Sequence, residues 1–269
     1  MIIYILVLML STGVWALLDF QADIGRGWSI FLGVLTFLVL QGVFTYFIRK
    51  RIVKDMESVG GILKAGQQKL QEKMQRWQIR PPGSIQEAQR IVAQDTKVFV
   101  GEALKQVDVL EKYRLWVPMI ERQMATAKFQ LYWMIKDFGM VDKLMKKVLF
   151  IDPTMVAMKM ARMYMLDKPM NEIEKCYRKA VRGMKYNQNV LLAACYSWIL
   201  VKKGNCDGAF KALTEALKKS DNETLKHNHQ CLMNNKVQQF NNAGLGDVWY
   251  SLMLEEPKIK MQRQRAVYR

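Results

Sequence analysis

Two long uncharged apolar stretches near the N-terminus constrain this chain more than any other feature. Residues 1–18 read MIIYILVLMLSTGVWALL and residues 28–48 read WSIFLGVLTFLVLQGVFTYFI, and neither contains a charged side chain. About 20 apolar helical residues cross the ~30 Å hydrocarbon core of a bilayer. The second stretch meets this length, and the first can cross with a modest mismatch. The sequence therefore predicts a transmembrane hairpin over residues 1–48, with helices at about 2–18 and 28–48.

A cleaved signal peptide is the alternative interpretation of the first stretch. Signal peptides have a basic region before the apolar run and a small-x-small cleavage site after it. No Lys or Arg precedes this run, and no A-x-A pattern stands before Asp19. We therefore favour a retained helix.

Basic residues predict the orientation of the hairpin. The second stretch is followed directly by Arg49, Lys50, Arg51 and Lys54, whereas the connecting loop has Arg26 as its one basic residue. Cytoplasmic flanks of transmembrane helices carry an excess of Lys and Arg. We expect a two-pass protein of the cell inner membrane with its soluble part in the cytoplasm; an organellar or endoplasmic reticulum membrane is the alternative. The four basic side chains are candidate contacts to lipid headgroups.

Residues 49–83 are predicted to be a basic amphipathic juxtamembrane helix and linker. Apolar residues spaced by three and four mark one helical face, namely Ile52, Met56, Val59, Leu63, Leu70, Met74 and Trp77. This face fits either of two roles, lying on an anionic membrane surface or forming a coiled coil between copies. Gly60, Gly61 and Gly66 weaken any long continuous helix, and Pro81-Pro82-Gly83 ends the segment.

Regular turn signals organise residues 84–255. Ser84 and Glu87 fit a capping box at the start of a long helix. The later breaks are Asp137-Phe138-Gly139, Asp152-Pro153, Asp167-Lys168-Pro169, Tyr186-Asn187, Lys203-Gly204-Asn205 and Ser220-Asp221-Asn222. The short helices between them should pair as antiparallel hairpins with a repeat of roughly 34 residues. The predicted fold class is therefore all-α.

Small and large residues recur where paired helices would cross. In the clearest unit, Ser197, Ala209 and Ala216 stand at small positions and Leu213 at a large one. Over about residues 120–255 the chain resembles a degenerate tetratricopeptide array, an α-solenoid of antiparallel helix pairs. The resemblance implies a concave groove for a protein partner, lined by Gln130, Trp133, Met158, Arg162, Met165, Ala194, Trp198 and Val201. Alternatively, Met158, Met165 and Trp198 belong to the core between repeats.

No catalytic or cofactor pattern accompanies the repeats. His227 and Cys231 share a helix face, but no further residues complete a four-ligand metal set. Nucleotide-binding and nucleophile motifs are also missing from the sequence. We therefore predict that the protein is not an enzyme and has no metal or cofactor.

The net charge of +17 fits cytoplasmic orientation and solubility. Nucleic acid is not an expected partner, because no recognised binding module is present. Residues 256–269 form a basic tail, either an arm for acidic partners or a disordered end. The sequence predicts a membrane-anchored protein-interaction scaffold or assembly factor. The alternative is an oligomeric structural component of the membrane, assembled through the N-terminal helices and the juxtamembrane segment.

Overall fold

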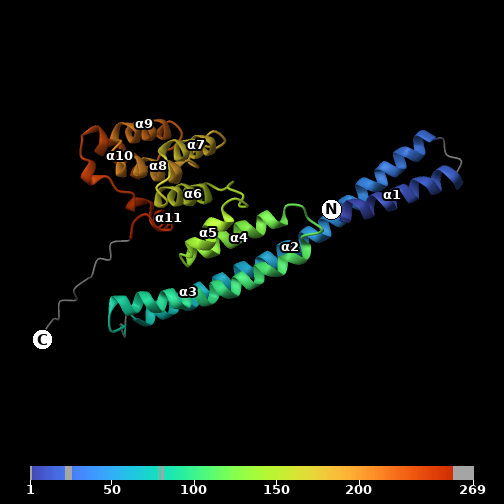
Figure 1. The fold of residues 1–269 in the computed structure, drawn as a ribbon, viewed down its shortest axis with the longest axis horizontal. Coiled ribbons are helices and arrows are strands. Elements are labelled where there is room, and N and C mark those ends of the chain that lie inside the picture. The colour runs from blue at the N-terminus through green and yellow to red at the C-terminus, as the bar shows by residue number, and fades with distance from the viewer. Residues whose placement is uncertain (1, 22–25, 78, 80–81, 257–269) are drawn as a thin grey trace. The chain divides into compact units, whose positions relative to one another are not determined.

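The computed structural model describes residues 2–21, 26–77, 79 and 82–256, and this part of the chain is helical without strands (Figure 1). It divides into two compact units, Met1–Leu149 and Phe150–Arg269. The division falls inside residues 84–255, which the sequence led us to expect as one domain. The predicted basic tail lies outside the described residues except for Glu256.

The first unit is built around one very long helix. Its elements are α1 (Ile2–Gln21), α2 (Arg26–Trp77), α3 (Ile85–Asp108), η1 (Val109–Tyr113), α4 (Ile120–Met134) and α5 (Phe138–Leu144). The 52 residues of α2 extend about 78 Å at 1.5 Å per residue. The apolar stretch and the basic juxtamembrane segment are therefore parts of a single helix. Among the described residues, this helix alone is long and apolar enough to cross a membrane, and its apolar 18-residue window has a mean hydropathy of 2.0.

The α1 helix packs against the N-terminal part of α2. A Cβ atom at Gly33 would lie 3.1 Å from Cβ of Trp15, so the small residue allows the two helices to approach closely. A Cβ atom at Gly42 in the same helix would meet no atom within 4 Å, so Gly42 does not mark a close approach of the two helices. The hydroxyls of Ser11 and Thr36 donate to carbonyls one turn earlier in their own helices, at 3.0 and 2.8 Å. These polar groups are thus satisfied within each helix, as an apolar environment requires.

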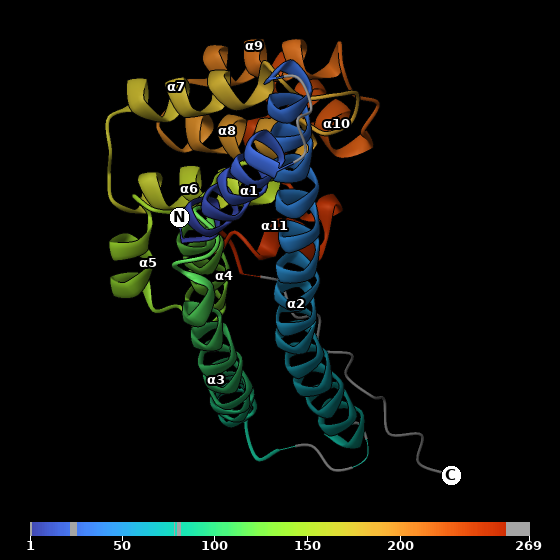
Figure 2. The same cartoon turned by 90° about the vertical axis from the view of Figure 1, so that its right-hand side faces the viewer.

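The C-terminal half of α2 forms an antiparallel pair with α3 (Figure 2). Ile52 and Val59 are buried in one core with the α3 and η1 residues Phe99, Val100, Ala103, Val107 and Leu110. For these two α2 residues, both roles expected from the sequence are incorrect. This part of the apolar face is covered by the chain's own next helix rather than by lipid or a second copy, whereas Met74 farther along the face is exposed.

Glycine does not interrupt α2, contrary to the expectation from helix propensity. A Cβ atom at Gly66 would lie 2.4–2.7 Å from ring and Cβ atoms of Phe99. Gly66 therefore makes room for an aromatic side chain of α3. The packing of α2 against α3 outweighs the helix-propensity cost of each glycine relative to alanine, which is ~1 kcal/mol.

Polar contacts also join α2 to the returning chain. Lys73 pairs with Asp95 at 2.7 Å, and Lys112 pairs with Asp55 at 2.9 Å. The hydroxyl of Tyr113 donates to the same Asp55 carboxylate at 3.0 Å. The hydrogen bond from Lys112 lowers the pKa of Asp55 below its usual value.

The second unit consists of helix pairs. Its elements are α6 (Pro153–Met165), α7 (Met170–Val181), α8 (Val190–Lys202), α9 (Cys206–Leu217), α10 (Glu223–Met233), η2 (Val237–Gln239), η3 (Ala243–Leu245) and α11 (Asp247–Tyr250). Within this unit α6 and α8 form one layer, and α7 and α9 form the other (Figures 1 and 2). Helix α8 packs against α6, α7 and α9, and every residue from Leu191 to Leu200 is buried. Its apolar sequence thus belongs to the centre of a core.

The same turn geometry closes successive helix pairs along the chain. A residue with positive φ follows the first helix of each pair, at Lys136, Asp167, Gly204 and Asn235. The next backbone N–H then donates five residues back, from Asp137 to Tyr132, Lys168 to Met163, Asn205 to Leu200 and Lys236 to Cys231, at 2.8–3.0 Å. This is the Schellman closure, which satisfies carbonyls at a helix end. Four local turns therefore share one structure although their sequences differ.

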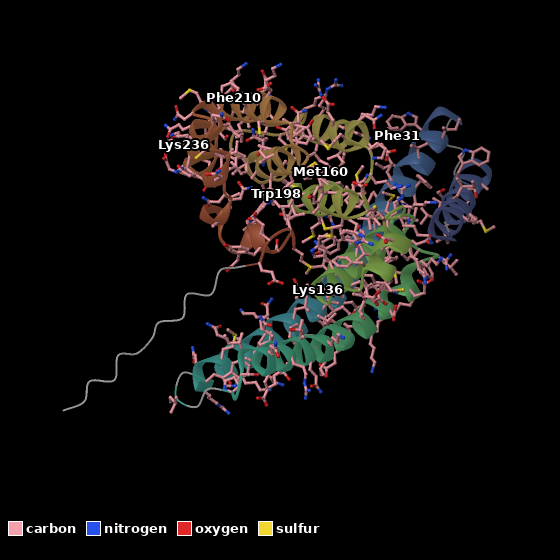
Figure 3. The ribbon with its side chains drawn as sticks, turned by 60° about the vertical axis from the view of Figure 1, so that its left-hand side comes forward. Phe31, Lys136, Met160, Trp198, Phe210 and Lys236 are labelled. Carbon is pink, nitrogen blue, oxygen red and sulfur yellow. The ribbon has the colours of Figure 1, made fainter. Side chains whose placement is uncertain are left out.

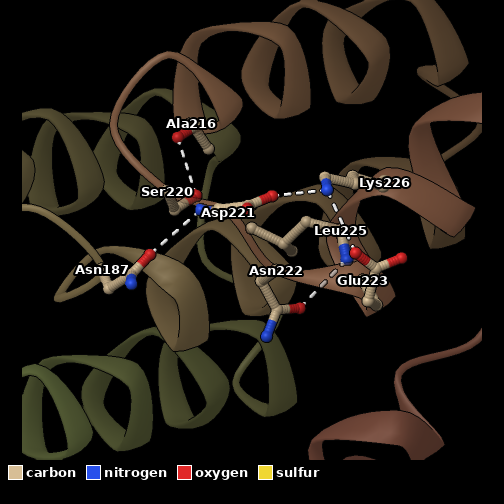
Figure 4. A network of polar contacts seen from close by, with 8 residues as sticks. All are labelled: Asn187, Ala216, Ser220, Asp221, Asn222, Glu223, Leu225 and Lys226. Atoms are coloured by element: carbon tan, nitrogen blue, oxygen red, sulfur yellow. Dashed lines mark hydrogen bonds and ion pairs between the residues drawn. The ribbon is translucent and has the colours of Figure 1, made fainter.

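The turns that follow the second helices of two successive pairs bond to each other (Figure 4). The Asp221 N–H donates to Oδ1 of Asn187 at 3.0 Å, across a separation of 34 residues. In return, the Asn187 N–H donates to the carbonyl of Lys219 at 2.9 Å. Equivalent turns of neighbouring pairs thus lie side by side, as in stacked repeats.

Candidate functional site

The groove residues predicted from the resemblance fall into both units. Gln130 and Trp133 lie in α4, where Gln130 is exposed and Trp133 is buried. The Trp133 ring stacks on Phe129 with centroids 5.9 Å apart and meets the edge of Phe138 at 5.5 Å. Trp133 is therefore a core residue of the first unit and does not line an open groove.

The other six predicted residues, which we call the inner-face set, lie on α6 and α8 of the second unit. They are Met158, Arg162 and Met165 on α6 and Ala194, Trp198 and Val201 on α8. The three α6 residues and Val201 are half-buried, whereas Ala194 and Trp198 are buried. The inner-face set is thus accessible along α6 and covered along the middle of α8.

Residues 242–255, which we call the closing segment, cover this part of α8. The buried Asn242 side chain donates to the carbonyl of Ala194 at 3.2 Å. The Trp249 ring is fully buried and lies with its centroid 5.9 Å from that of Trp198. Figure 3 shows Trp198 on the side of α8 that faces α11.

The carboxylate of Glu255 anchors the end of the closing segment to α8 by hydrogen bonds. The two indole N–H groups of Trp198 and Trp249 donate to Oε1 and Oε2 of Glu255, at 2.7 and 2.8 Å. Charge-assisted hydrogen bonds of this kind are stronger than neutral ones. The expectation that Ala194 and Trp198 line an open groove is therefore corrected: the chain's own C-terminal part occupies that place. No local sequence pattern predicts this contact, because Glu255 stands 57 residues after Trp198.

An open cleft of about 760 Å³ lies on the opposite layer of the second unit, and we call it the outer groove. It runs between α7 and α9, with Tyr196 and Leu200 of α8 among its lining residues. Its charged lining residues are Glu174, Arg178, Arg182, Lys211, Glu215 and Lys219. Arg178 pairs with Glu174 at 2.6 Å, and the remaining charged residues are three basic and one acidic. The lining is therefore basic overall.

Two stacked tyrosines form the aromatic part of the outer groove. The rings of Tyr177 and Tyr196 lie 4.3 Å apart at 16°. Burial raises the pKa of Tyr177 to about 12, with the neighbouring Tyr196 as a further cause. Both rings line the outer groove but expose only 8% and 7% of their surface, so they form part of its base rather than an open contact surface.

The predicted headgroup contacts, Arg49, Lys50, Arg51 and Lys54, are all exposed on α2. Arg49 also lines a pocket, which lies within the first unit between α2 and the turn before α4.

The histidine and cysteine side chains pack locally. His227 Nε2 lies 3.5 Å from the Cys231 thiol, and His229 contacts the Thr214 hydroxyl at 3.0 Å. The His229 ring also stacks on Phe210 with centroids 4.5 Å apart. Within the described part of the chain, no three His, Cys, Asp or Glu side chains gather closely enough to hold a metal ion.

Comparison with known proteins identifies no relative of this chain. No protein-family model, characterised protein or solved structure matches the chain.

Proposed function

We propose that this protein is a membrane-anchored interaction scaffold. In this proposal α1 and the apolar part of α2 form a two-pass hairpin in the cell inner membrane. The second unit is a tetratricopeptide-like array in the cytoplasm, and it binds a protein partner. The protein acts by holding that partner at the membrane surface.

The exposed apolar surface of α2 supports the membrane anchor. Ile30, Phe31 and Leu38 each expose more than half of their side-chain surface, at 55%, 56% and 60%. An apolar patch of this size is unfavourable in water, but lipid tails cover it without cost. The basic residues that follow Ile48 support the cytoplasmic placement of the rest.

The repeated closure of helix pairs is the observation that carries the scaffold proposal. Within the second unit, the Schellman turns after α6, α8 and α10 and the 34-residue spacing between bonded turns fit an array of stacked hairpins. Stacked hairpins expose extended surfaces, and such arrays use them to bind peptides and proteins.

The outer groove is the proposed binding surface. Its volume of about 760 Å³ lies within the range of ordinary ligand pockets, roughly 300–1,000 Å³. The half-buried side chains of Met170 and Val181 offer an apolar contact, and Arg182, Lys211 and Lys219 favour negative charge. The partner that fits best is an acidic protein segment carrying an aromatic or apolar residue.

Site-specific photo-crosslinking in intact membranes tests this surface. A benzophenone amino acid replaces Lys211 in the outer groove, Val201 in the inner-face set or Lys236 on the exposed turn after α10. We expect a discrete heterologous adduct from position 211 and none from position 236. An adduct from position 201 alone would move the partner to the inner face. Equal labelling at all three positions, or none at any, would contradict the scaffold proposal.

Protease protection tests the topology. Protease added to inside-out vesicles should remove the second unit, while right-side-out vesicles should protect it. The opposite pattern would reverse the proposed orientation. The alternative function, a structural oligomer assembled through the juxtamembrane face, has less apolar surface to use, because α3 covers Ile52 and Val59.

A further inference from the structure

A pocket of about 630 Å³ lies within the first unit, between α2 and the turn that leads into α4. Its α2 wall is formed by Gln41, Thr45, Ile48, Arg49, Ile52, Val53, Met56 and Glu57. Trp116, Val117 and Pro118 from the turn, with Gln123 from α4, complete the lining. The pocket is mostly apolar and has one basic side chain, Arg49, in the middle of its α2 wall.

The position of the pocket along α2 is informative. Arg49 is the first charged residue after the apolar stretch, so the pocket straddles the point where α2 would leave the hydrocarbon. Gln41 and Glu57 each lie about 12 Å from Arg49 along the helix, in opposite directions. One end of the pocket therefore faces the acyl region, and the other faces the cytoplasm.

The turn on the other side of the pocket is itself suited to a membrane surface. Leu115 and Met119 expose 61% and 45% of their surface, and Trp116 exposes 36%. Exposed apolar residues on a turn are costly in water, whereas Trp in particular is enriched at the level of lipid headgroups. Arg114 precedes this group and pairs with Glu111 at 2.9 Å.

One lining residue of the pocket, Gln41, carries a polar atom without a partner. Its Oε1 is buried and makes no hydrogen bond to any described protein atom. Buried polar atoms are almost always satisfied. Because this atom is shielded from solvent, it does not face the open pocket, and rotation of the side-chain amide would turn either an acceptor or a donor toward an occupant.

We infer that this pocket binds one anionic glycerophospholipid from the cytoplasmic leaflet. Its phosphate pairs with Arg49, its glycerol backbone and one acyl chain lie against Ile48 and Thr45 on the acyl side of Arg49, and the indole of Trp116 covers it. Glu57 repels the headgroup from the far end of the pocket, which fixes the orientation of the lipid. The inference rests on the proposed membrane anchor and extends it, because the turn at residues 114–119 becomes a second contact with the bilayer.

Native mass spectrometry of the full-length protein in detergent tests the site. Phosphatidylglycerol is titrated and the fraction carrying one bound lipid is measured, with phosphatidylcholine and soluble glycerol phosphate as separate arms. We expect a saturable adduct with one phosphatidylglycerol and weaker adducts in the other two arms. The substitution Arg49→Gln should weaken the phosphatidylglycerol adduct about fivefold, the contribution of one basic side chain at an anionic surface.

Arg51→Gln is the matched control, because it removes the same charge half a turn away from a residue outside the pocket. It should change the adduct less than about twofold if the pocket, rather than overall charge, selects the lipid. Leu115→Ser with Trp116→Ser should weaken the adduct as Arg49→Gln does, whereas Ile151→Ser, on an exposed residue of the second unit, should not.

Three results would overturn the inference. Equal losses for Arg49→Gln and Arg51→Gln would show nonspecific attraction, and equal adducts with phosphatidylcholine would show no preference for charge. Competition by glycerol phosphate would show a site for soluble phosphates. Vesicle flotation of the same variants separates this failure from failure of the anchor. A protein that floats but lacks the adduct retains its anchor, whereas one that does not float has lost both proposals.

Discussion

Gly61 and Gly66 lie in the same helix, yet the structure gives them opposite surroundings. A Cβ atom at Gly61 would meet nothing within 4 Å, whereas one at Gly66 would overlap Phe99. Gly61→Ala should therefore stabilise the protein by about 0.5–1 kcal/mol through helix propensity. Gly66→Ala should destabilise it by about 1–3 kcal/mol, because a core residue must move.

Thermal unfolding of the two variants in the same detergent measures this difference in sign. The comparison is direct, since the chemical change and the helix are identical. Stabilisation by Gly66→Ala would show that Phe99 does not pack over this glycine.

Tyr177 makes the stability of the second unit depend on alkaline pH. The ordinary pKa of tyrosine is 10.0, and burial raises the pKa of Tyr177 to about 12. Between these values the unfolded chain loses a proton that the folded chain keeps, so folding becomes less favourable as pH rises. The stability present below pH 10 should fall by on the order of 2 kcal/mol toward pH 12.

Tyr177→Phe should flatten that part of the pH profile, measured by denaturant unfolding from pH 9 to 12. Tyr186→Phe is the control, because Tyr186 is exposed and its removal should leave the slope unchanged. An unaltered slope in Tyr177→Phe would place the titration on another group.

The closing segment is the element that most changes the reading of the second unit. The closing segment contacts α8 through buried Asn242, through Trp249 and through the Glu255 carboxylate. Glu255→Gln keeps the size of the side chain but removes the charge, and the amide can accept from one indole N–H in place of two. We expect a loss of about 1–2 kcal/mol in unfolding free energy and a change in tryptophan emission.

Glu256→Gln provides the control, since Glu256 is the next residue along the chain and is exposed. Denaturant unfolding, followed by tryptophan fluorescence, compares the unfolding free energies of the Glu255→Gln and Glu256→Gln variants. Equal effects of both substitutions would mean that the contact between Glu255 and the two indoles contributes little.

At the scale of the whole molecule, the boundary between the units predicts which fragments fold. A fragment of residues 84–269 keeps α3 but lacks α2, so Phe99, Val107 and Leu110 would lose their partners. We expect it to aggregate or bind hydrophobic dyes. A fragment of residues 150–269 contains all of the second unit and should unfold cooperatively.

A fragment of residues 49–269 restores the C-terminal part of α2 and should recover a folded α2–α3 pair. Circular dichroism and dye binding compare the three fragments. A well-folded 84–269 fragment would show that α3 does not need α2.

The sequence by itself determined the local features of this protein. Apolar runs without charge identified the long membrane-type helix, because hydrophobic length is a property of consecutive residues. Turn residues located the helix ends well: the Ser84 hydroxyl accepts from the Glu87 N–H as the capping pattern requires, and Gly204 and Asn205 form the turn between α8 and α9. Caps and turns are set by neighbours within a few residues, which a sequence displays directly.

The tertiary structure alone decided what covers each apolar face. The spacing of Ile52 and Val59 showed that this side of α2 must be buried, but lipid, a second copy and α3 satisfy the same pattern. Likewise, Trp198 lies in the first helix of a helix pair, and this position is compatible with a residue that lines an open groove or with one that the chain covers. Its partner Glu255 becomes visible only when the chain folds back. Hydrophobic burial is non-directional, so a sequence specifies that a face is covered, while the path of the whole chain decides by what.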